Sequence, residues 1–429
     1  MRRSLVVGVL LFLGATVVNP AVADPPAPPA SVIRSWNDTA LRTVRLKSAS
    51  DAQAARLYAM VNVAMYDAVN GLATNAANRR GEALVPPSRS AVGSPVAAAA
   101  GAAHDVLAGL YPDQAAAFDA ELASDLAGIT PALAALGRSW GGRVAAAVLA
   151  ARADDGSSPN ASQPGGSGPG QFTASWSGVQ FRNLKPFAIA DPAAYVSPGP
   201  PALTSLDYAA AFAEVKLLGN AAIPDAAKLA TFQYWSLGGG TSQPPGAWVQ
   251  VASAVSASRS LSLDDTARLF ALESMAMADT VAPTYETKFE THSWRPQTAI
   301  RGAESDGNPD TVADPTWSAR AGSVGSSPEH WSGHSSFSAA AATVLKDFFC
   351  RDAIPFSLVT DSSPGGAARS YPSFSAAMVE AGRSRVYGGF HFEFSNQAGL
   401  AAGRDIAAEV VAHKLLVLRG TTHVGDCPL

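Results

Sequence analysis

Cysteine is nearly absent from this chain, since only Cys350 and Cys427 occur among its 429 residues. Two cysteines cannot build a cysteine-rich metal centre, so a structural zinc site of that kind is excluded. In an exported protein the two thiols are expected to form one disulfide that ties the C-terminal tail to the body. Two unpaired, buried thiols are the alternative.

Long apolar runs are missing after the first 23 residues, and positive charge is not in excess. No later segment has the roughly 18 uninterrupted apolar residues of a membrane-spanning helix, so no stable membrane anchor is expected. The formal net charge is −4. A mildly acidic chain is poorly suited to binding nucleic acid or an anionic membrane surface. The sequence indicates no particular oligomeric state.

The N-terminus is the exception to the lack of apolar runs. An arginine pair at positions 2 and 3 precedes apolar residues from Leu5 to Val18, and Ala21-Val22-Ala23 follows with small residues at the two decisive positions. This pattern is typical of a secretory signal peptide, whose apolar core is too short to span a bilayer. We therefore predict that residues 1–23 are removed and that the mature protein is secreted.

Strict alternation of polar and apolar residues, the pattern of a half-buried strand, is also scarce. Apolar residues instead recur at helical spacing, as at Leu57, Val61, Ala64 and Ala68. The sequence therefore predicts an all-α fold with two packed helical bundles. Helices are expected within 92–155 with breaks at 111–113 and 128–131, and at 205–218, 225–236, 246–258, 372–383 and 397–418.

The composition divides the chain into three regions after the signal peptide. Residues 24–154 form an N-terminal helical region. Residues 155–201 form a loop-rich connection, because their Gly, Pro and Ser residues provide no core of their own. Residues 202–429 form a C-terminal helical domain, which holds most of the chain's chemically reactive side chains.

Three short motifs in the C-terminal domain bring together cations and imidazoles. The first is Lys288-Phe-Glu-Thr-His-Ser-Trp-Arg295-Pro, the second is Glu329-His-Trp-Ser-Gly-His-Ser, and the third is Ser384-Arg-Val-Tyr-Gly-Gly-Phe-His391. Three permanent cations, two histidines and a glycine that allows close backbone approach suit a tetrahedral oxyanion. The rest of the chain is interpreted as the scaffold of this site.

Taken singly, each motif has an ordinary structural explanation. Lys288 and Arg295 are two helical turns apart and would share one side of a continuous helix, but two surface cations would look the same. Ser332-Gly333-His334 precedes a helix, whose free N–H groups favour an anion, yet the tripeptide is common. Between Arg385 and His391 two glycines predict a bend, and a lone histidine there is more often a core residue.

The three motifs in this order resemble the pattern shared by vanadium-dependent haloperoxidases and bacterial class A acid phosphatases. That pattern is Lys-x6-Arg-Pro, Pro-Ser-Gly-His and Ser-Arg-x5-His; here Trp331 replaces the proline of the second part. The resemblance implies a vanadium haloperoxidase type of fold with the active site in the C-terminal bundle. It covers about a quarter of the chain by motif.

The resemblance also implies a role for each motif residue. Lys288, Arg295, Ser332, Gly333 and Arg385 would hold the oxygens of vanadate or phosphate. His391 would bond vanadium, or attack phosphorus in a phosphatase. His334 would be the acid–base residue. An aspartate often orients the ring four residues after such a histidine, but Ser395 stands there; Glu393 could take its place.

We predict a vanadate-dependent haloperoxidase that oxidises halide with hydrogen peroxide to hypohalous acid. The helical region from Val32 to Asp154 resembles the additional bundle of that group, whereas class A phosphatases resemble only the C-terminal half. The alternative is a secreted acid phosphatase that hydrolyses phosphate monoesters through a phospho-histidine. A non-catalytic helical scaffold with an anion site is the third possibility.

Overall fold

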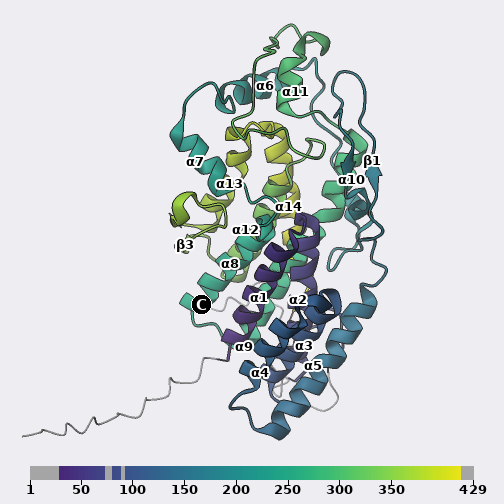
Figure 1. Ribbon diagram of the computed structural model, residues 1–429, viewed down its shortest axis with the longest axis vertical. Helices are drawn as coiled ribbons and strands as arrows, with labels where there is room; N and C mark the ends of the chain where they lie inside the picture. Colours follow the sequence, from purple (N-terminus) through teal and green to yellow (C-terminus); the bar gives the residue numbers. More distant parts are fainter. Residues whose placement is uncertain (1–28, 73–79, 88–91, 417–429) are drawn as a thin grey trace, which may run out of the picture.

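The computed structural model describes residues 29–72, 80–87 and 92–416, and this part of the chain is largely helical (Figure 1). It contains fourteen α-helices, five short 3-10 helices and two antiparallel pairs of very short strands. The all-α prediction is therefore confirmed. The predicted signal peptide, residues 1–23, and Cys427 lie outside the described residues, whereas Cys350 is disulfide-bonded.

The N-terminal bundle forms the lower end of the molecule in Figure 1. Close packing of its helices depends on small residues, because a Cβ at Gly137 or Gly141 would lie 2.3 or 2.2 Å from a backbone oxygen of the facing helix. The predicted breaks fall between helices, where Pro131 starts a new one. The helices of this bundle are α1 (Ser31–Lys47), α2 (Asp51–Gly71), α3 (Pro95–Leu110), α4 (Ala115–Leu126) and α5 (Pro131–Ala151), with η1 (Pro112–Gln114).

The C-terminal bundle occupies the upper part of the molecule. Its α-helices are α6 (Leu206–Leu218), α7 (Ala226–Tyr234), α8 (Gln243–Ser258), α9 (Leu263–Asp279), α10 (Val281–Thr291), α11 (Pro296–Arg301), α12 (Gly333–Phe348), α13 (Phe374–Tyr387) and α14 (Glu393–His413). Helix α14 begins four residues before the predicted start at Gln397, and α13 continues four residues beyond the predicted end at Arg383. As a result, α13 ends within the third motif and α14 begins two residues after it.

Two helices of this bundle, α12 and α14, pack closely along their length. A Cβ at Gly399 would lie 2.5 Å from the carbonyl oxygen of Ser332, and one at Gly403 would lie 2.2 Å from that of Ser336. Glycine is therefore required at both positions for the helices to approach. Their contact brings the second and third motifs to the same end of the bundle.

The two bundles share one apolar core. Helix α2 packs against α8 and α9, and α9 packs in turn against α12 and α14. Polar residues of α2 are hydrogen-bonded within this core. Asn62 exchanges hydrogen bonds with Asn37, and Asp67 accepts three backbone N–H groups. The shared core fixes the start of α2 relative to the C-terminal bundle.

The connection between the bundles has little regular structure of its own. It contains the antiparallel strands β1 (Ser162–Gln163) and β2 (Trp176–Ser177), with η2 (Val179–Asn183) and η3 (Pro192–Tyr195). Trp176 and Phe181 are buried and hold it on the body. The remaining short elements are β3 (Phe356–Leu358), paired with β4 (Arg369–Tyr371), and the 3-10 helices η4 (Ala303–Ser305) and η5 (Pro364–Gly366).

Candidate active site

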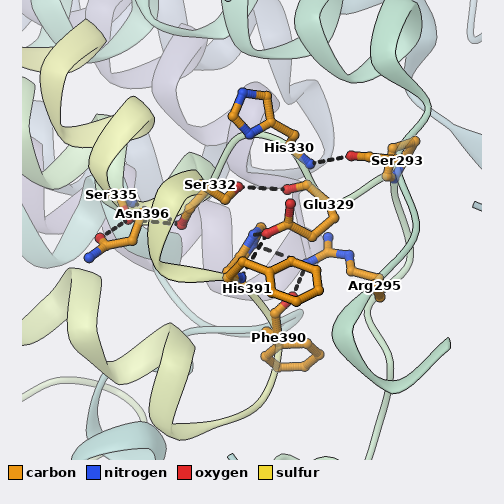
Figure 2. A network of polar contacts seen from close by, with 12 residues as sticks. Ser293, Arg295, Glu329, His330, Ser332, Ser335, Phe390, His391 and Asn396 are labelled. Carbon is orange, nitrogen blue, oxygen red and sulfur yellow. Dashed lines mark hydrogen bonds and ion pairs between the residues drawn. The ribbon is translucent and has the colours of Figure 1, made fainter. Parts of the chain in front are cut away.

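A buried carboxylate holds the ring of His391 in one orientation (Figure 2). Nδ1 of His391 lies 2.9 Å from Oε1 of Glu329, which also accepts the backbone N–H of Phe392 at 3.0 Å. The guanidinium of Arg295 lies beside Nε2 and can only donate, so Nε2 is the acceptor and Nδ1 carries the proton. Nε2 therefore keeps its lone pair and accepts from Nη1 of Arg295 at 3.0 Å. Such a nitrogen is suited to binding a metal or attacking an electrophile.

The three predicted cations converge on one cavity of about 560 Å³, which His334 and His391 also line. The predicted reason for their convergence is wrong. Helix α10 carries Lys288 but ends at Thr291, because His292 adopts a left-handed conformation with φ +45°. Arg295 is the N-cap residue of the next helix, α11. The two cations therefore reach the cavity from two successive helices rather than from two turns of one helix.

Backbone carbonyls fix two of the cations. Nε of Arg295 donates to the carbonyl of Ser327 at 2.8 Å, and Nη1 donates to the carbonyl of Phe390 at 2.9 Å. Nζ of Lys288 donates to the carbonyls of Pro328 and Glu329. The ammonium has three protons, so it retains donor capacity for a ligand.

Arg385, in the last turn of α13, lacks such partners. Its side chain is 6% exposed, and neither Nε nor Nη1 has a hydrogen-bond partner among the described residues. The guanidinium lies over the rings of Phe232 and Phe390, with Cζ 5.5 and 4.8 Å from the ring centroids. Buried donors without acceptors are costly, so this arrangement favours the binding of an anion.

The electrostatics of the cavity lead to the same inference. Burial lowers the pKa of Lys288 well below its usual value, and the nearby Arg295 lowers it further. Burial lowers the pKa of Arg385 to about 9, again with a contribution from Arg295. Burial raises the pKa of Glu329 to about 7, although Arg295 and Lys288 oppose this shift. Three buried cations thus face one buried carboxylate, and a bound anion would relieve their repulsion.

The second motif forms the start of α12. His334 lines the cavity, and its Nε2 donates to the carbonyl of Ser236 at 3.1 Å, which leaves Nδ1 as the acceptor. Burial, followed by the charge of Arg385, holds the pKa of His334 well below its usual value. His391 shows the same direction of pKa shift for the same reasons, with Arg295 the largest charge contribution. Both imidazoles are therefore neutral in the site as described.

Ser332, which was predicted to hold an oxygen of the anion, does not line the cavity. Six of the seven predicted residues line the cavity, but Ser332 is fully buried and is not among the lining residues. It is the N-cap of α12, where its Oγ accepts the backbone N–H and the hydroxyl of Ser335. The neighbouring Gly333 does line the cavity. The contact with an anion at this point is thus expected from the Gly333 amide.

The group that orients His391 is neither Ser395 nor Glu393, the residue that the sequence offered for this role. Ser395 donates to the backbone carbonyl of Glu329, and Glu393 pairs with Arg383. Glu329, the first residue of the second motif, performs this role instead. Its position in that motif as the only acidic residue was a signal that could have identified it. Asp51 and Tyr285 also line the cavity and were missed, because no motif connects Asp51 to the C-terminal domain.

Trp331, which replaces the proline of the family pattern, connects the second motif to α10. Its indole Nε1 donates to Oγ1 of Thr284 at 2.7 Å, and both side chains are 2% exposed. Thr284 lies one turn before Lys288 on the same helix. The tryptophan therefore helps to fix the second motif against the helix that carries the lysine.

Comparison with known proteins places this geometry in context. Residues 268–420 match the family model described as the VCPO second helical-bundle domain. A bacterial vanadium-dependent iodoperoxidase structure superposes with a TM-score of 0.75 at 23% identity, over 90% of this chain and 97% of that one. No curated protein sequence matches this chain.

Two structures of a bacterial vanadium-dependent chloroperoxidase, one apo and one holo, are also similar. The apo structure superposes with a TM-score of 0.62 at 15% identity, over 83% of this chain and 92% of that one. The holo structure superposes with a TM-score of 0.62 at 16% identity, over 89% of this chain and 92% of that one. The match to the family model, over residues 268–420, and these structural similarities agree with the resemblance to vanadium haloperoxidases that the three motifs indicated. They also confirm the two-bundle helical fold.

Proposed function

We propose that this chain is a vanadate-dependent haloperoxidase, which oxidises halide with hydrogen peroxide to hypohalous acid. The observation that carries the proposal is the position of Nε2 of His391. Glu329 fixes its lone pair toward a cavity lined by three buried cations, one of which, Arg385, has buried donors without acceptors. A metal oxyanion would bond the lone pair in place of the Arg295 N–H and supply acceptors for the cations.

The residues of the cavity fit vanadate. His391 would bond the metal through Nε2, while Lys288, Arg295, Arg385 and the Gly333 amide would hold its oxygens. Bound vanadate would supply a Lewis acid that polarises peroxide toward attack by halide. The unpartnered Nε and Nη1 of Arg385 are buried donors that the oxygens of a tetrahedral anion could satisfy.

The protein's own groups would manage protons and water. Neutral His334 has a free acceptor at Nδ1 and can take a proton from hydrogen peroxide as it binds. A bound anion would favour the resulting imidazolium. Phe232, Phe337 and Phe390 line the cavity beside these groups and limit the access of water.

A phosphatase acting through a phospho-histidine would use the same atoms, since phosphate and vanadate have similar shapes. The extent of the structural similarity supports the haloperoxidase, because it covers 90% of the chain and thus includes the N-terminal bundle. The resemblance to class A phosphatases concerns only the C-terminal half. The two activities can be measured on one preparation.

The test uses one purified sample divided in two. One portion is loaded with orthovanadate and assayed for peroxide-dependent bromination of a phenolic dye; the other, without vanadate, is assayed with a chromogenic phosphate monoester. We expect bromination that is lost in His391→Ala and retained in His413→Ala, which changes an exposed histidine near the end of α14. Phosphate release without bromination would establish the phosphatase instead.

We further propose that the protein is secreted after removal of residues 1–23. The arginine pair, the apolar run and the small residues before Asp24 support this proposal. Expression of the full chain in a bacterial host, followed by N-terminal sequencing of the exported protein, should give Asp24 as the first residue. Retention of the intact N-terminus in the cell would contradict it.

A further inference from the structure

The cavity contains a carboxylate from the N-terminal bundle. Asp51, the first residue of α2, lines it together with Lys288 and Gly333. A Cβ built on Gly333 would lie 3.6 Å from Oδ2 of Asp51. Oδ2 is therefore beside the residue whose amide is expected to contact the bound oxyanion. An acidic group is unexpected so close to an anion site, because like charges repel.

The two oxygens of Asp51 have different surroundings. Oδ1 accepts the hydroxyl of Tyr285 at 3.0 Å and the N–H of Ala52 at 2.7 Å. Burial raises the pKa of Tyr285 well above its usual value, so this hydroxyl stays protonated and donates. Within the described residues no donor reaches Oδ2. Oδ2 is thus left as a free acceptor beside Gly333.

We propose that Asp51 makes this site selective for tetrahedral oxyanions that carry a proton. Such an anion can direct its unprotonated oxygens toward Lys288, Arg295 and Arg385 and donate its own hydroxyl to Oδ2 of Asp51. A fully deprotonated anion would place an oxygen lone pair against the carboxylate, with no proton between them. The inference rests on the proposed function only in requiring that the cavity binds a tetrahedral oxyanion.

The selectivity would distinguish the ligands relevant to this site. Hydrogen vanadate and hydrogen phosphate carry a hydroxyl, whereas sulfate and the dianion of a phosphate monoester do not. Asp51 would thus permit vanadate and disfavour phosphate monoesters. A hydrogen bond to a charged group is strong, and leaving it unmade is costly. The site should therefore bind a protonated oxyanion about tenfold or more tightly than a fully deprotonated one.

Sulfate and hydrogen phosphate provide a matched pair of probes. In a buffer in which both are dianions, they share shape and charge and differ by one proton. Their dissociation constants are measured by calorimetry on the full, vanadate-free protein, for the wild type and for Asp51→Asn. We expect the wild type to bind hydrogen phosphate at least about tenfold more tightly than sulfate. In Asp51→Asn, whose amide can donate to sulfate, this ratio should fall to about one.

Two further variants control for indirect effects. Tyr285→Phe alters the same part of the cavity but keeps the carboxylate, so the preference for hydrogen phosphate should remain. Asp207→Asn removes an exposed acidic residue in the first turn of α6 and should change neither constant. Thermal melting of each variant verifies that it is folded.

The outcomes separate the two proposals. Equal binding of both anions by the wild type, or an unchanged preference in Asp51→Asn, would overturn the role of Asp51 while leaving the oxyanion site intact. Failure of the wild type to bind phosphate, sulfate or vanadate would overturn the oxyanion site itself, and the selectivity with it. A preference that disappears equally in Tyr285→Phe would overturn its assignment to the carboxylate alone, because the Tyr285 hydroxyl donates to Oδ1 of Asp51.

Discussion

Glu329 reaches His391 across 62 residues of sequence, and its Oε1 binds both Nδ1 of the ring and the N–H of Phe392. The carboxylate thereby aligns the imidazole with the backbone that carries it. It also makes the ring a stronger ligand, because a charged acceptor at Nδ1 increases the basicity of Nε2. Binding that involves a bond to Nε2 should therefore depend on Glu329 more strongly than binding that does not.

We expect Glu329→Gln to weaken vanadate binding by about tenfold to a hundredfold, as is typical when the partner of a metal-binding histidine is lost. Phosphate, which forms no metal bond to His391, should bind with similar or higher affinity, because the substitution removes a negative charge. Calorimetric titration with both anions measures the change. Glu393→Gln, which removes the partner of Arg383 instead, should leave the ratio of the two affinities unaltered. A parallel loss for both anions in Glu329→Gln would argue against this role.

Features that neighbouring residues determine could be predicted from the sequence, whereas contacts between distant segments could not. The breaks at 111–113 and 128–131 and the bend at Gly388-Gly389 were predicted correctly, because neighbouring residues determine them. The orientation of His391 and the presence of Asp51 in the cavity depend on packing between distant segments. A single sequence contains no direct signal for such contacts. Lys288 and Arg295 were correctly brought together for the wrong reason, since local helix termination at His292 was not foreseen.

The lowered pKa of Lys288 predicts that anion binding takes up protons. Burial and Arg295 disfavour its charged form in the empty cavity, and a bound anion would favour that form. The lysine therefore holds its proton less firmly before binding than afterwards, so affinity should fall as the pH rises through the lowered pKa of Lys288. Phosphate titrations in buffers of different ionisation enthalpy measure the number of protons taken up. Lys288→Gln should reduce this number, while the contribution from phosphate itself remains. The same number in both proteins would show that Lys288 keeps its charge throughout.

Arg385 should stabilise the protein when an anion is bound and destabilise it when none is bound. Its buried Nε and Nη1 lack acceptors, so Arg385→Met, which keeps most of the side-chain volume, should raise the free energy of unfolding without anion by about 1–3 kcal/mol. Vanadate binding should be lost in the same variant. Denaturant unfolding in buffer free of oxyanions tests the first effect, and titration tests the second.

Arg383→Met is the matched control, because Arg383 lies two residues earlier on the same helix and pairs with Glu214 and Glu393. This variant should lower the free energy of unfolding and still bind vanadate. If Arg385→Met destabilised the empty protein as much as Arg383→Met, the guanidinium of Arg385 would have a structural role that its missing hydrogen bonds do not suggest.

Two glycines of the cavity should respond differently to alanine. A Cβ at Gly333 would meet Asp51, Phe337 and Thr284 at 3.6–3.9 Å, which are ordinary contacts, and the residue begins α12. Gly333→Ala should therefore leave the free energy of unfolding unchanged or raise it by up to about 1 kcal/mol. All three neighbours line the cavity, so the methyl group would enter the space of the anion. Because a methyl there displaces an anion held by charge-assisted hydrogen bonds, affinity should fall by roughly tenfold or more.

Gly325 differs because its φ is +87° and its Cβ would lie 2.9 Å from Cζ of Arg295. Gly325→Ala should lower the free energy of unfolding by about 1 kcal/mol or more, and it should also weaken anion binding by displacing Arg295. Denaturant unfolding and anion titration on both variants separate the two effects. Loss of affinity with unchanged stability in Gly333→Ala alone would place the anion against the start of α12. Unchanged affinity in that variant would place it elsewhere in the cavity, away from both Gly333 and Asp51.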